Sequence, residues 1–381
     1  MDKVEIGRML RRLTQVDGLS GSEERVGAVV RELAQPYAAE VRSCRLGSVI
    51  AYKPGMGTHT PPATETPAKT APDAGLRAGS VPGRIMLAAH MDEIGLIVTR
   101  VEGSFLHVSR VGGPDPRNLL AQEVTVYPTG PGSEHFPDGL PGYIGSRPPH
   151  VLSEQERSKV VPMEALRVDL GTPALGDSVR VGDRIAVCGP YAELLAGRVA
   201  SKALDDRASV AAMLGALGYL GGMQHSWDVY AVATIQEEVG EMGAATTAFG
   251  VAPDVAIALD VTFGDTPGLD DTETVEMDKG PVISWGPNMH PGLVKKLREV
   301  ADDIELGYVS EPIPGGSGTD AWAIQVSREG VPTALVGIAI RYMHSAAEMA
   351  VLADVDRTAR LLAAFISRLD GDFLAHLPEE V

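Results

Sequence analysis

The chain has 381 residues, with 51 acidic side chains against 33 basic ones and a formal net charge of −18 at pH 7. This charge excludes a protein that binds nucleic acid through its phosphates, because such contacts need Lys and Arg. The length predicts two or three domains, and a hydrophobic content of 44% can build a core in each. Two cysteines, Cys44 and Cys188, provide no disulfide framework. Since no signal-peptide core or membrane-spanning run is present, we expect a cytoplasmic protein with no membrane or nucleic-acid partner.

Residues 1–95 predict the first part of an α/β domain. Apolar spacing predicts helices at Lys3–Gln15 and Glu23–Leu33 and strands at Val41–Tyr52 and Arg84–Ala89. Ser22 is the expected N-cap of the second helix. Between the two strands, residues 54–82 consist mostly of Pro, Thr, Ala and Gly and contain no aromatic side chain. This composition predicts a disordered surface insertion.

Residues 96–190 have a different sequence pattern, in which short β-rich stretches are separated by turns that contain Gly and Pro. The expected strands lie at Leu96–Arg100, Phe105–Val111, Glu123–Tyr127 and Ser178–Val187. We predict a small all-β, barrel-like domain that is inserted into the α/β domain.

In residues 191–381, strands again alternate with helices. The predicted helices are Asp206–Leu220, a short one after Val239, Pro291–Asp303, Thr319–Glu329 and Asp354–Leu369, and the predicted strands are Asp228–Gln236, Asp254–Val261 and Pro332–Ile338. This alternation predicts βαβ crossovers and a doubly wound sheet with helices on both faces.

Five polar clusters lie at or just beyond the ends of the predicted α/β-domain strands, where ligands of open α/β sheets collect. They are His90 with Asp92, Asp205 with Asp206, Glu237 with Glu238, Asp260, and His344. Each has an ordinary explanation when taken alone, such as acids at a helix N-terminus or a histidine in a loop. Two acids beside a buried strand, as at Glu237 and Glu238, are harder to explain without partners or cations.

Taken together, these clusters supply enough imidazole and carboxylate ligands for two divalent cations that share one bridging carboxylate. Nitrogen and oxygen ligands without thiolate favour Zn, Co or Mn. Hydrolysis also needs a carboxylate that acts as general base without binding metal. Glu237 and Asp92 are the candidates, and Asp92 is better placed to orient His90.

The sequence resembles the tetrahedral aminopeptidases, a family that includes glutamyl aminopeptidases and members labelled endoglucanases. The resemblance covers nearly the whole chain, including the inserted β-domain. The motifs that carry it, in chain order, are Ala89-His90-Met91-Asp92-Glu93-Ile94-Gly95, Ser201-Lys202-Ala203-Leu204-Asp205-Asp206-Arg207, Thr234-Ile235-Gln236-Glu237-Glu238-Val239-Gly240, Asp260-Val261 and Arg341-Tyr342-Met343-His344-Ser345.

The resemblance implies a mixed α/β sheet of the zinc-exopeptidase type and a metal-dependent aminopeptidase that removes the N-terminal residue of peptides. It implies two divalent ions per subunit, Zn with Co or Mn as alternatives. The implied ligands are Asp205 as the bridge, His90 and Asp260 on one ion, and Glu238 and His344 on the other. Glu237 would be the general base and Asp92 the partner of His90.

The resemblance also implies that residues 96–190 mediate dimerisation and that dimers assemble into a tetrahedral dodecamer. The segment Gly315–Asp320 resembles the family's substrate-pocket loop, which makes Gly316, Thr319 and Asp320 candidate substrate contacts. The alternative is a flexible loop capped by Thr319. The chain departs from the family pattern in its long 54–82 insertion and in the pair Glu241-Met242.

Three other functions are compatible with parts of the pattern. One is a related two-metal amidohydrolase, either an N-acyl-amino-acid deacylase or a dipeptidase. Another is a glycoside hydrolase, which would need a carboxyl pair flanking a sugar and no metal. The third is a metal-stabilised scaffold, which would leave Glu237 without a purpose. The preferred N-terminal side chain does not follow from the sequence.

Overall fold

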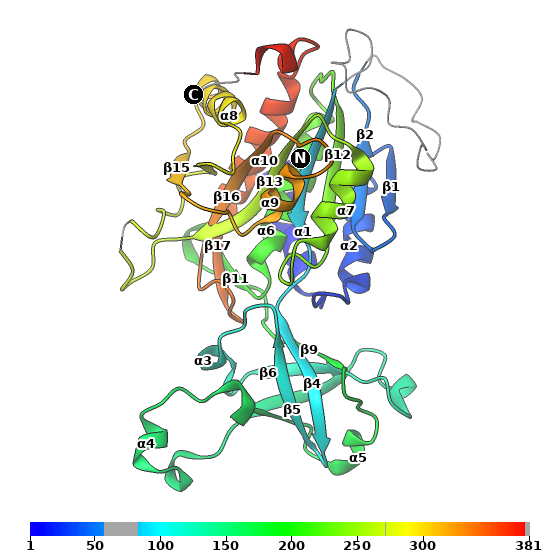
Figure 1. Ribbon diagram of the computed structural model, residues 1–381, viewed down its shortest axis with the longest axis vertical. Helices are drawn as coiled ribbons and strands as arrows, with labels where there is room; N and C mark the ends of the chain where they lie inside the picture. Colours follow the sequence, from blue (N-terminus) through cyan, green and yellow to red (C-terminus); the bar gives the residue numbers. More distant parts are fainter. Residues whose placement is uncertain (57–82, 271, 378–381) are drawn as a thin grey trace.

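The computed structural model describes residues 1–56, 83–270 and 272–377, so positions 57–82 of the predicted insertion lie outside the described residues. The described chain forms an α/β part and a β-barrel that extends from one end of it (Figure 1). The predicted α/β class with a small barrel is therefore confirmed.

A large mixed sheet forms the centre of the α/β part. Eleven strands of the described chain belong to it: β1 (Glu40–Ser43), β2 (Val49–Lys53), β3 (Arg84–His90), β10 (Ala192–Glu193), β11 (Arg198–Ser201), β12 (Asp228–Thr234), β13 (Val255–Phe263), β14 (Val282–Trp285), β15 (Val309–Pro312), β16 (Thr333–Arg341) and β17 (Glu348–Val351). The neighbours β12, β3, β13 and β16 are parallel, and their apolar residues are buried on both faces.

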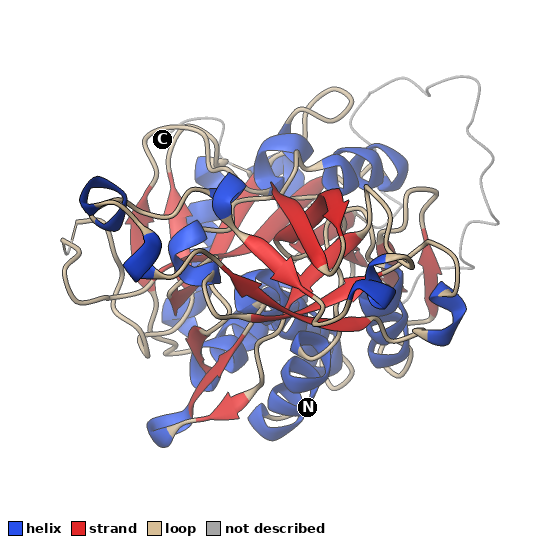
Figure 2. Ribbon diagram, turned by 90° about the horizontal axis from the view of Figure 1, so that it is seen from below, coloured by secondary structure: helices blue, strands red, loops and turns tan. Residues whose placement is uncertain are grey.

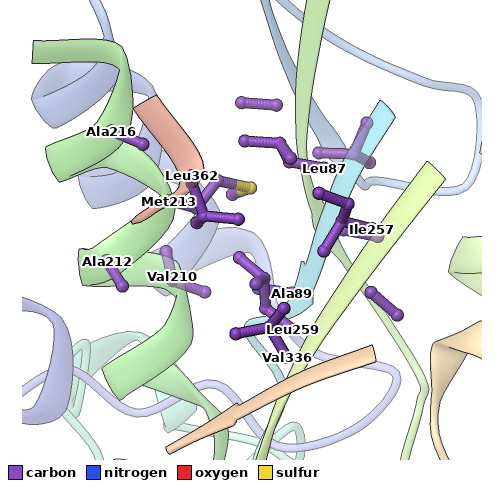
Figure 3. Close-up of a cluster of buried hydrophobic side chains, with 14 of the residues drawn as sticks. Leu87, Ala89, Val210, Ala212, Met213, Ala216, Ile257, Leu259, Val336 and Leu362 are labelled. Carbon is purple, nitrogen blue, oxygen red and sulfur yellow. The ribbon is translucent and has the colours of Figure 1, made fainter. Parts of the chain in front are cut away.

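Helices cover both faces of this sheet. They are α1 (Lys3–Thr14), α2 (Glu24–Ala34), α6 (Leu204–Leu220), α7 (Met242–Val251), α8 (Pro291–Asp303), α9 (Asp320–Gln325) and α10 (Leu352–Ser367). The central helix α6 packs on β3 and β13 and is flanked by α1 and α10. Figure 3 shows this core, in which Val210 and Met213 of α6 face Leu87 and Ile257 of the sheet. On the other face, α7 and α9 pack on each other and on the central strands.

Two local predictions near the N-terminus were wrong. The predicted strand Val41–Tyr52 is a hairpin of β1 and β2, because the chain turns at Gly47, whose φ of +122° suits glycine. Ser22 does not cap α2: Glu23 occupies the N-cap position, and no side chain makes the capping hydrogen bond.

The barrel closes on itself and has its own hydrophobic core, which includes Leu96, Leu106, Val168 and Ile185. Its strands, in order around the barrel, are β4 (Gly95–Glu102), β5 (Phe105–Val111), β8 (Arg167–Asp169), β7 (Leu140–Gly145), β6 (Glu123–Tyr127) and β9 (Arg184–Val187). Short helices α3 (Pro116–Leu119), α4 (Glu154–Arg157) and α5 (Pro173–Gly176) join them. Figure 2 looks onto this end of the molecule. Over the described residues, we find no helix with the length and apolarity to cross a bilayer.

Candidate metal centre

The four central strands bring four of the five predicted clusters to one edge of the sheet. His90 ends β3, Glu237 and Glu238 follow β12, Asp260 lies in β13, and His344 follows β16. Because these neighbouring strands are parallel, their carboxyl ends lie side by side. The structure thus gathers residues that are as much as 254 positions apart in the sequence, counting from His90 to His344 (344 − 90 = 254).

The carboxylate of Asp205, from the first turn of α6, lies between the two histidines. Its Oδ1 is 3.1 Å from Nε2 of His90, and its Oδ2 is 3.3 Å from Nε2 of His344. Each oxygen of one carboxylate therefore faces a different imidazole. This is the arrangement that a carboxylate shared by two cations requires.

Three further carboxylates surround this group. Nε2 of His90 lies 3.8 Å from Oε2 of Glu237 and 3.9 Å from Oδ1 of Asp260. Nε2 of His344 lies 3.6 Å from Oε1 of Glu238. The side chains of His90, Asp260 and Glu238 are all at least nine-tenths buried.

Asp92 positions the segments beside the site through hydrogen bonds. Its fully buried carboxylate accepts hydrogen bonds from the backbone N–H groups of Glu237 and Glu238, at 3.1 and 3.3 Å, and from the hydroxyl of Ser20 at 2.6 Å. The ring Nδ1 of His90 lies 3.6 Å from Oδ1 of Asp92 and 3.3 Å from its carbonyl oxygen. These contacts orient the imidazole so that Nε2 points into the cluster.

Glu348, on β17, is a member of the site that sequence reasoning missed. This carboxylate is 2% exposed and accepts hydrogen bonds from the backbone N–H groups of Asp205, at 3.0 Å, and His344, at 2.9 Å. It therefore fixes the backbone beneath two of the predicted ligands. The only sequence signal was an acid four residues after His344, before a short apolar run.

Asp206 also belongs to the cluster. Its carboxylate is buried, and Oδ2 accepts a hydrogen bond from the backbone N–H of His90 at 3.2 Å. Its Oδ1 has no hydrogen-bond partner within the described part of the chain. An unpartnered, buried carboxylate oxygen beside His90 and Asp260 is a position that a cation would satisfy.

Burial makes the carboxylates difficult to ionise without added positive charge. It raises the pKa of Glu237 to about 9 and that of Glu238 to about 8, and the nearby carboxylate of Asp205 adds to both shifts. Burial also raises the pKa of Asp260 well above its ordinary value. For Asp205 burial acts in the same direction, but the hydrogen bonds from both histidines outweigh it and hold its pKa low.

The donor set fits divalent cations. Two groups of ligand atoms, each within 4.8 Å of one another, occur in the described chain: His90 with Asp206 and Asp260, and His90 with Asp205 and Glu238. The acids outnumber the imidazoles, so cations rather than internal salt bridges can neutralise them. Oxygen and imidazole ligands without thiolate suit Zn, Co or Mn.

A cleft opens from this cluster along β13 towards β14 and β15. It is lined by the metal-centre residues, by Thr319 and by apolar and polar side chains of these strands. Of the three predicted substrate contacts, Thr319 faces the cleft and also caps α9 by accepting a hydrogen bond from the N–H of Ala321. Gly316 and Asp320 are not part of the lining, and the buried Asp320 instead accepts a hydrogen bond from the Thr234 hydroxyl at 2.5 Å.

A doubly wound sheet with this cluster at the ends of its central strands defines a metal-dependent exopeptidase. A model of the M42 glutamyl aminopeptidase family matches residues 76–361. The chain belongs to this metallopeptidase family, and the resemblance seen in the motifs is confirmed. It is thus a peptide hydrolase.

Relatives agree with this assignment along their whole length. The lysyl aminopeptidase of Pyrococcus furiosus is 34% identical over 368 residues, covering 95% of this chain and 96% of that protein. An aminopeptidase from Desulfurococcus kamchatkensis superimposes with a TM-score of 0.84 at 34% identity, covering 100% of this chain and 99% of that one. The TET1 peptidase of Pyrococcus horikoshii, which can assemble into a tetrahedron or a large octahedral shell, has a TM-score of 0.77 at 28% identity, with 96% and 100% covered.

Proposed function

We propose that this aminopeptidase removes the N-terminal residue of peptides with two divalent ions and with Glu237 as general base. The observation that carries the proposal is the Asp205 carboxylate, which offers one oxygen to the side of His90 and the other to the side of His344. In this proposal Asp205 would help to hold both ions. His90 and Asp260 would complete one ligand set, and Glu238 and His344 would complete the other.

Bound divalent ions would supply Lewis acidity and a lowered pKa for water at this position. The chain's own residues would move the protons. Glu237 is close to His90 but outside the proposed ligand sets, so its carboxylate can accept a proton from the attacking water. It then returns that proton to the nitrogen of the leaving amine, which restores its starting state.

Glu237 can act as a base near neutral pH only if positive charge enters the cluster. Without it, burial keeps the pKa of this carboxyl near 9, and the group holds its proton. Cations close to a carboxyl lower its pKa. Base catalysis is thus coupled to occupation of the metal centre.

We propose Zn as the native metal, with Co and Mn as alternatives, because all three accept imidazole and carboxylate ligands. Removing metal with a chelator should abolish hydrolysis of aminoacyl-anilides. Adding back each ion in turn identifies those that restore the activity. Full activity in the presence of the chelator would contradict a metal-dependent mechanism.

The decisive test of the base is Glu237→Gln, which keeps the size of the side chain and removes its proton affinity. We expect kcat to fall by about 10²–10⁴-fold while two ions remain bound. Exposed Glu329, outside the cleft lining, provides the matched control Glu329→Gln, which should keep normal kcat. Near-normal kcat in Glu237→Gln would overturn the assignment.

A related deacylase or dipeptidase would use the same metal centre. An aminopeptidase recognises the free α-amine, so it should release amino acids from unblocked peptides and not from N-acetylated ones. Tripeptides and longer peptides should be substrates as well as dipeptides. Rapid hydrolysis of N-acetyl substrates would favour the deacylase.

We further propose that the barrel mediates self-association into dimers and then into a dodecameric shell. The assembly of the similar TET1 peptidase supports this, as do the large apolar side chains on the barrel surface. Tyr143, Val151, Val160 and Val181 are all more than half exposed. Light scattering coupled to size exclusion should give a mass near twelve subunits, and a monomer would contradict the proposal.

A further inference from the structure

The cleft is also lined by a carboxylate that the mechanism does not use, that of Glu311. Glu311 lies on β15, beside Ser284 of β14, its partner in the strand register. Thr262 lies on β13, two residues beyond Asp260, so both of their side chains leave the same face of the strand. All four residues line the cleft that begins at the metal centre.

Two hydroxyl groups hold the Glu311 carboxylate in position. Thr262 donates to its Oε1 at 2.6 Å, and Ser284, which is 1% exposed, donates to its Oε2 at 3.0 Å. A carboxylate offers about four acceptor sites, so two hydroxyl donors leave the group able to accept more hydrogen bonds. Its charge is also not balanced locally: within the described residues, no Lys, Arg or His nitrogen lies within 4.0 Å of it.

The rest of the cleft has the same sign of charge. Glu241 also lines it, while no Lys or Arg occurs among the lining residues of the described chain. Apolar residues, including Val261, Ile313 and Leu335, also line the cleft. The cleft therefore combines apolar walls with the uncompensated carboxylate of Glu311.

We propose that Glu311 selects peptides whose N-terminal residue is lysine or arginine. This inference rests on the proposed aminopeptidase function, in which the N-terminal residue lies beside the metal centre. A lysine carries its ammonium on a flexible four-carbon stem. Asp260 and Thr262 are two residues apart, or about 6.6 Å along the strand, a separation that such a stem can span to reach the carboxylate.

The same features discriminate against other side chains. A glutamate side chain would approach Glu311 and Glu241, and like charges brought together in a partly buried site are strongly unfavourable. Leucine would contact the apolar walls of the cleft but leave the Glu311 carboxylate without a cation. The expected order of kcat/KM is therefore Lys and Arg first, Leu next and Glu last.

The experiment compares Lys-, Arg-, Leu- and Glu-anilides on the metal-loaded, full-length enzyme. We expect the wild type to hydrolyse Lys-anilide at least about tenfold more efficiently than Leu-anilide. Glu311→Gln should lose roughly tenfold or more with Lys-anilide and change less than about threefold with Leu-anilide. Glu329→Gln, which changes the net charge equally, should keep the wild-type order.

A second variant, Glu311→Lys, reverses the charge and should raise the Glu-anilide to Lys-anilide ratio. A wild type that prefers Glu-anilide would overturn the proposal, and so would an equal loss of Lys and Leu activity in Glu311→Gln. If no anilide and no unblocked peptide is hydrolysed by the wild type, the proposed aminopeptidase function itself has failed. The two failures are thus distinguishable.

Discussion

Two buried clusters of charged residues lie next to each other in this molecule and differ in how their charges are balanced. One is the metal centre, where carboxylates outnumber histidines. The other, here called the ionic network, consists of Asp17, Glu93, Lys202 and Arg207. It contains two acids and two bases.

The charged groups of the ionic network are paired with one another. Lys202 contacts Asp17 and lies 2.8 Å from Oε2 of Glu93, whose Oε1 is 3.2 Å from Nη2 of Arg207. Arg207 also donates to the carbonyl oxygens of Leu13, at 2.8 Å, and Met91, at 3.1 Å. A hydrogen bond from Tyr127 to Asp17 joins the network to the barrel.

The same two sequence motifs supply both clusters. Asp92 supports the metal centre while its neighbour Glu93 joins the network, and Asp205 enters the metal centre while Arg207 joins the network. Buried charge alone therefore does not mark a catalytic site. An excess of carboxylates, which bound protons or an external cation must balance, separates the metal centre from the structural network.

The largest effect on stability should come from unbalancing the network. Arg207→Met leaves Glu93 with one cation fewer and leaves backbone carbonyls unpaired. Loss of one partner of a buried ion pair costs about 3–5 kcal/mol. We expect a decrease of this size in the free energy of unfolding, measured with denaturant. A change below about 1 kcal/mol would mean that the network is not structural.

Asp260→Asn, in contrast to Arg207→Met, should lower activity strongly and change stability little. Activity should fall on the order of 10³-fold, because metal assistance contributes several kcal/mol to the barrier. Stability measured with a chelator should change by less than about 1 kcal/mol, since burial raises the pKa of this carboxyl well above its ordinary value and Asn resembles the protonated form. A large destabilisation, like that expected for Arg207→Met, would erase the contrast between the clusters.

Glu348→Gln tests the support of the metal centre. A glutamine offers a single carbonyl oxygen, so it cannot accept hydrogen bonds from Asp205 and His344 with two oxygens as the carboxylate does. Loss of such support weakens metal binding by about 10–100-fold. Excess metal should therefore restore much of the activity, which metal titrations can measure. Wild-type affinity would show that Glu348 is dispensable.

The pH dependence of the free energy of unfolding should reveal the excess of carboxyl groups at the metal centre. In the presence of a chelator, folding raises the pKa of Glu237 to about 9 and of Glu238 to about 8, mainly through burial, so the folded chain binds more protons than the unfolded one. Stability should then fall by at least about 1 kcal/mol between about pH 5 and about pH 8. His344, whose pKa is raised to about 9 by its hydrogen bond to Asp205, adds to this fall.

Saturating metal replaces those protons and should flatten this slope or reverse its sign. Denaturant unfolding at several pH values, with and without metal, makes the comparison. Carboxyls with a lowered pKa, such as Asp17 in the network, titrate below this range and do not mask it. Stability of the metal-free protein that rises from about pH 5 to about pH 8 would contradict the prediction.

The sequence alone determined the family and the fold class, and it predicted the residues that the structure gathers at the candidate metal centre. Apolar runs ending on His90 and before Glu237 are local features, and they predict buried strands with polar residues at their ends. The order of five motifs then supplied the resemblance. Element ends were less well predicted: β13 continues to Phe263, so Asp260 lies within a strand.

Only the tertiary structure decided which charges meet. Spacing does not show that Glu93 turns away from Asp92 towards Lys202, or that Glu348 returns on β17 to support Asp205. Spacing also does not show that Glu311 lies beside Thr262, which is 49 residues earlier in the chain. Strand order and side-chain direction set these contacts, and both depend on packing between distant segments. The candidate ligands were therefore readable from local pattern, whereas the charge balance and the proposed specificity depend on the assembled fold.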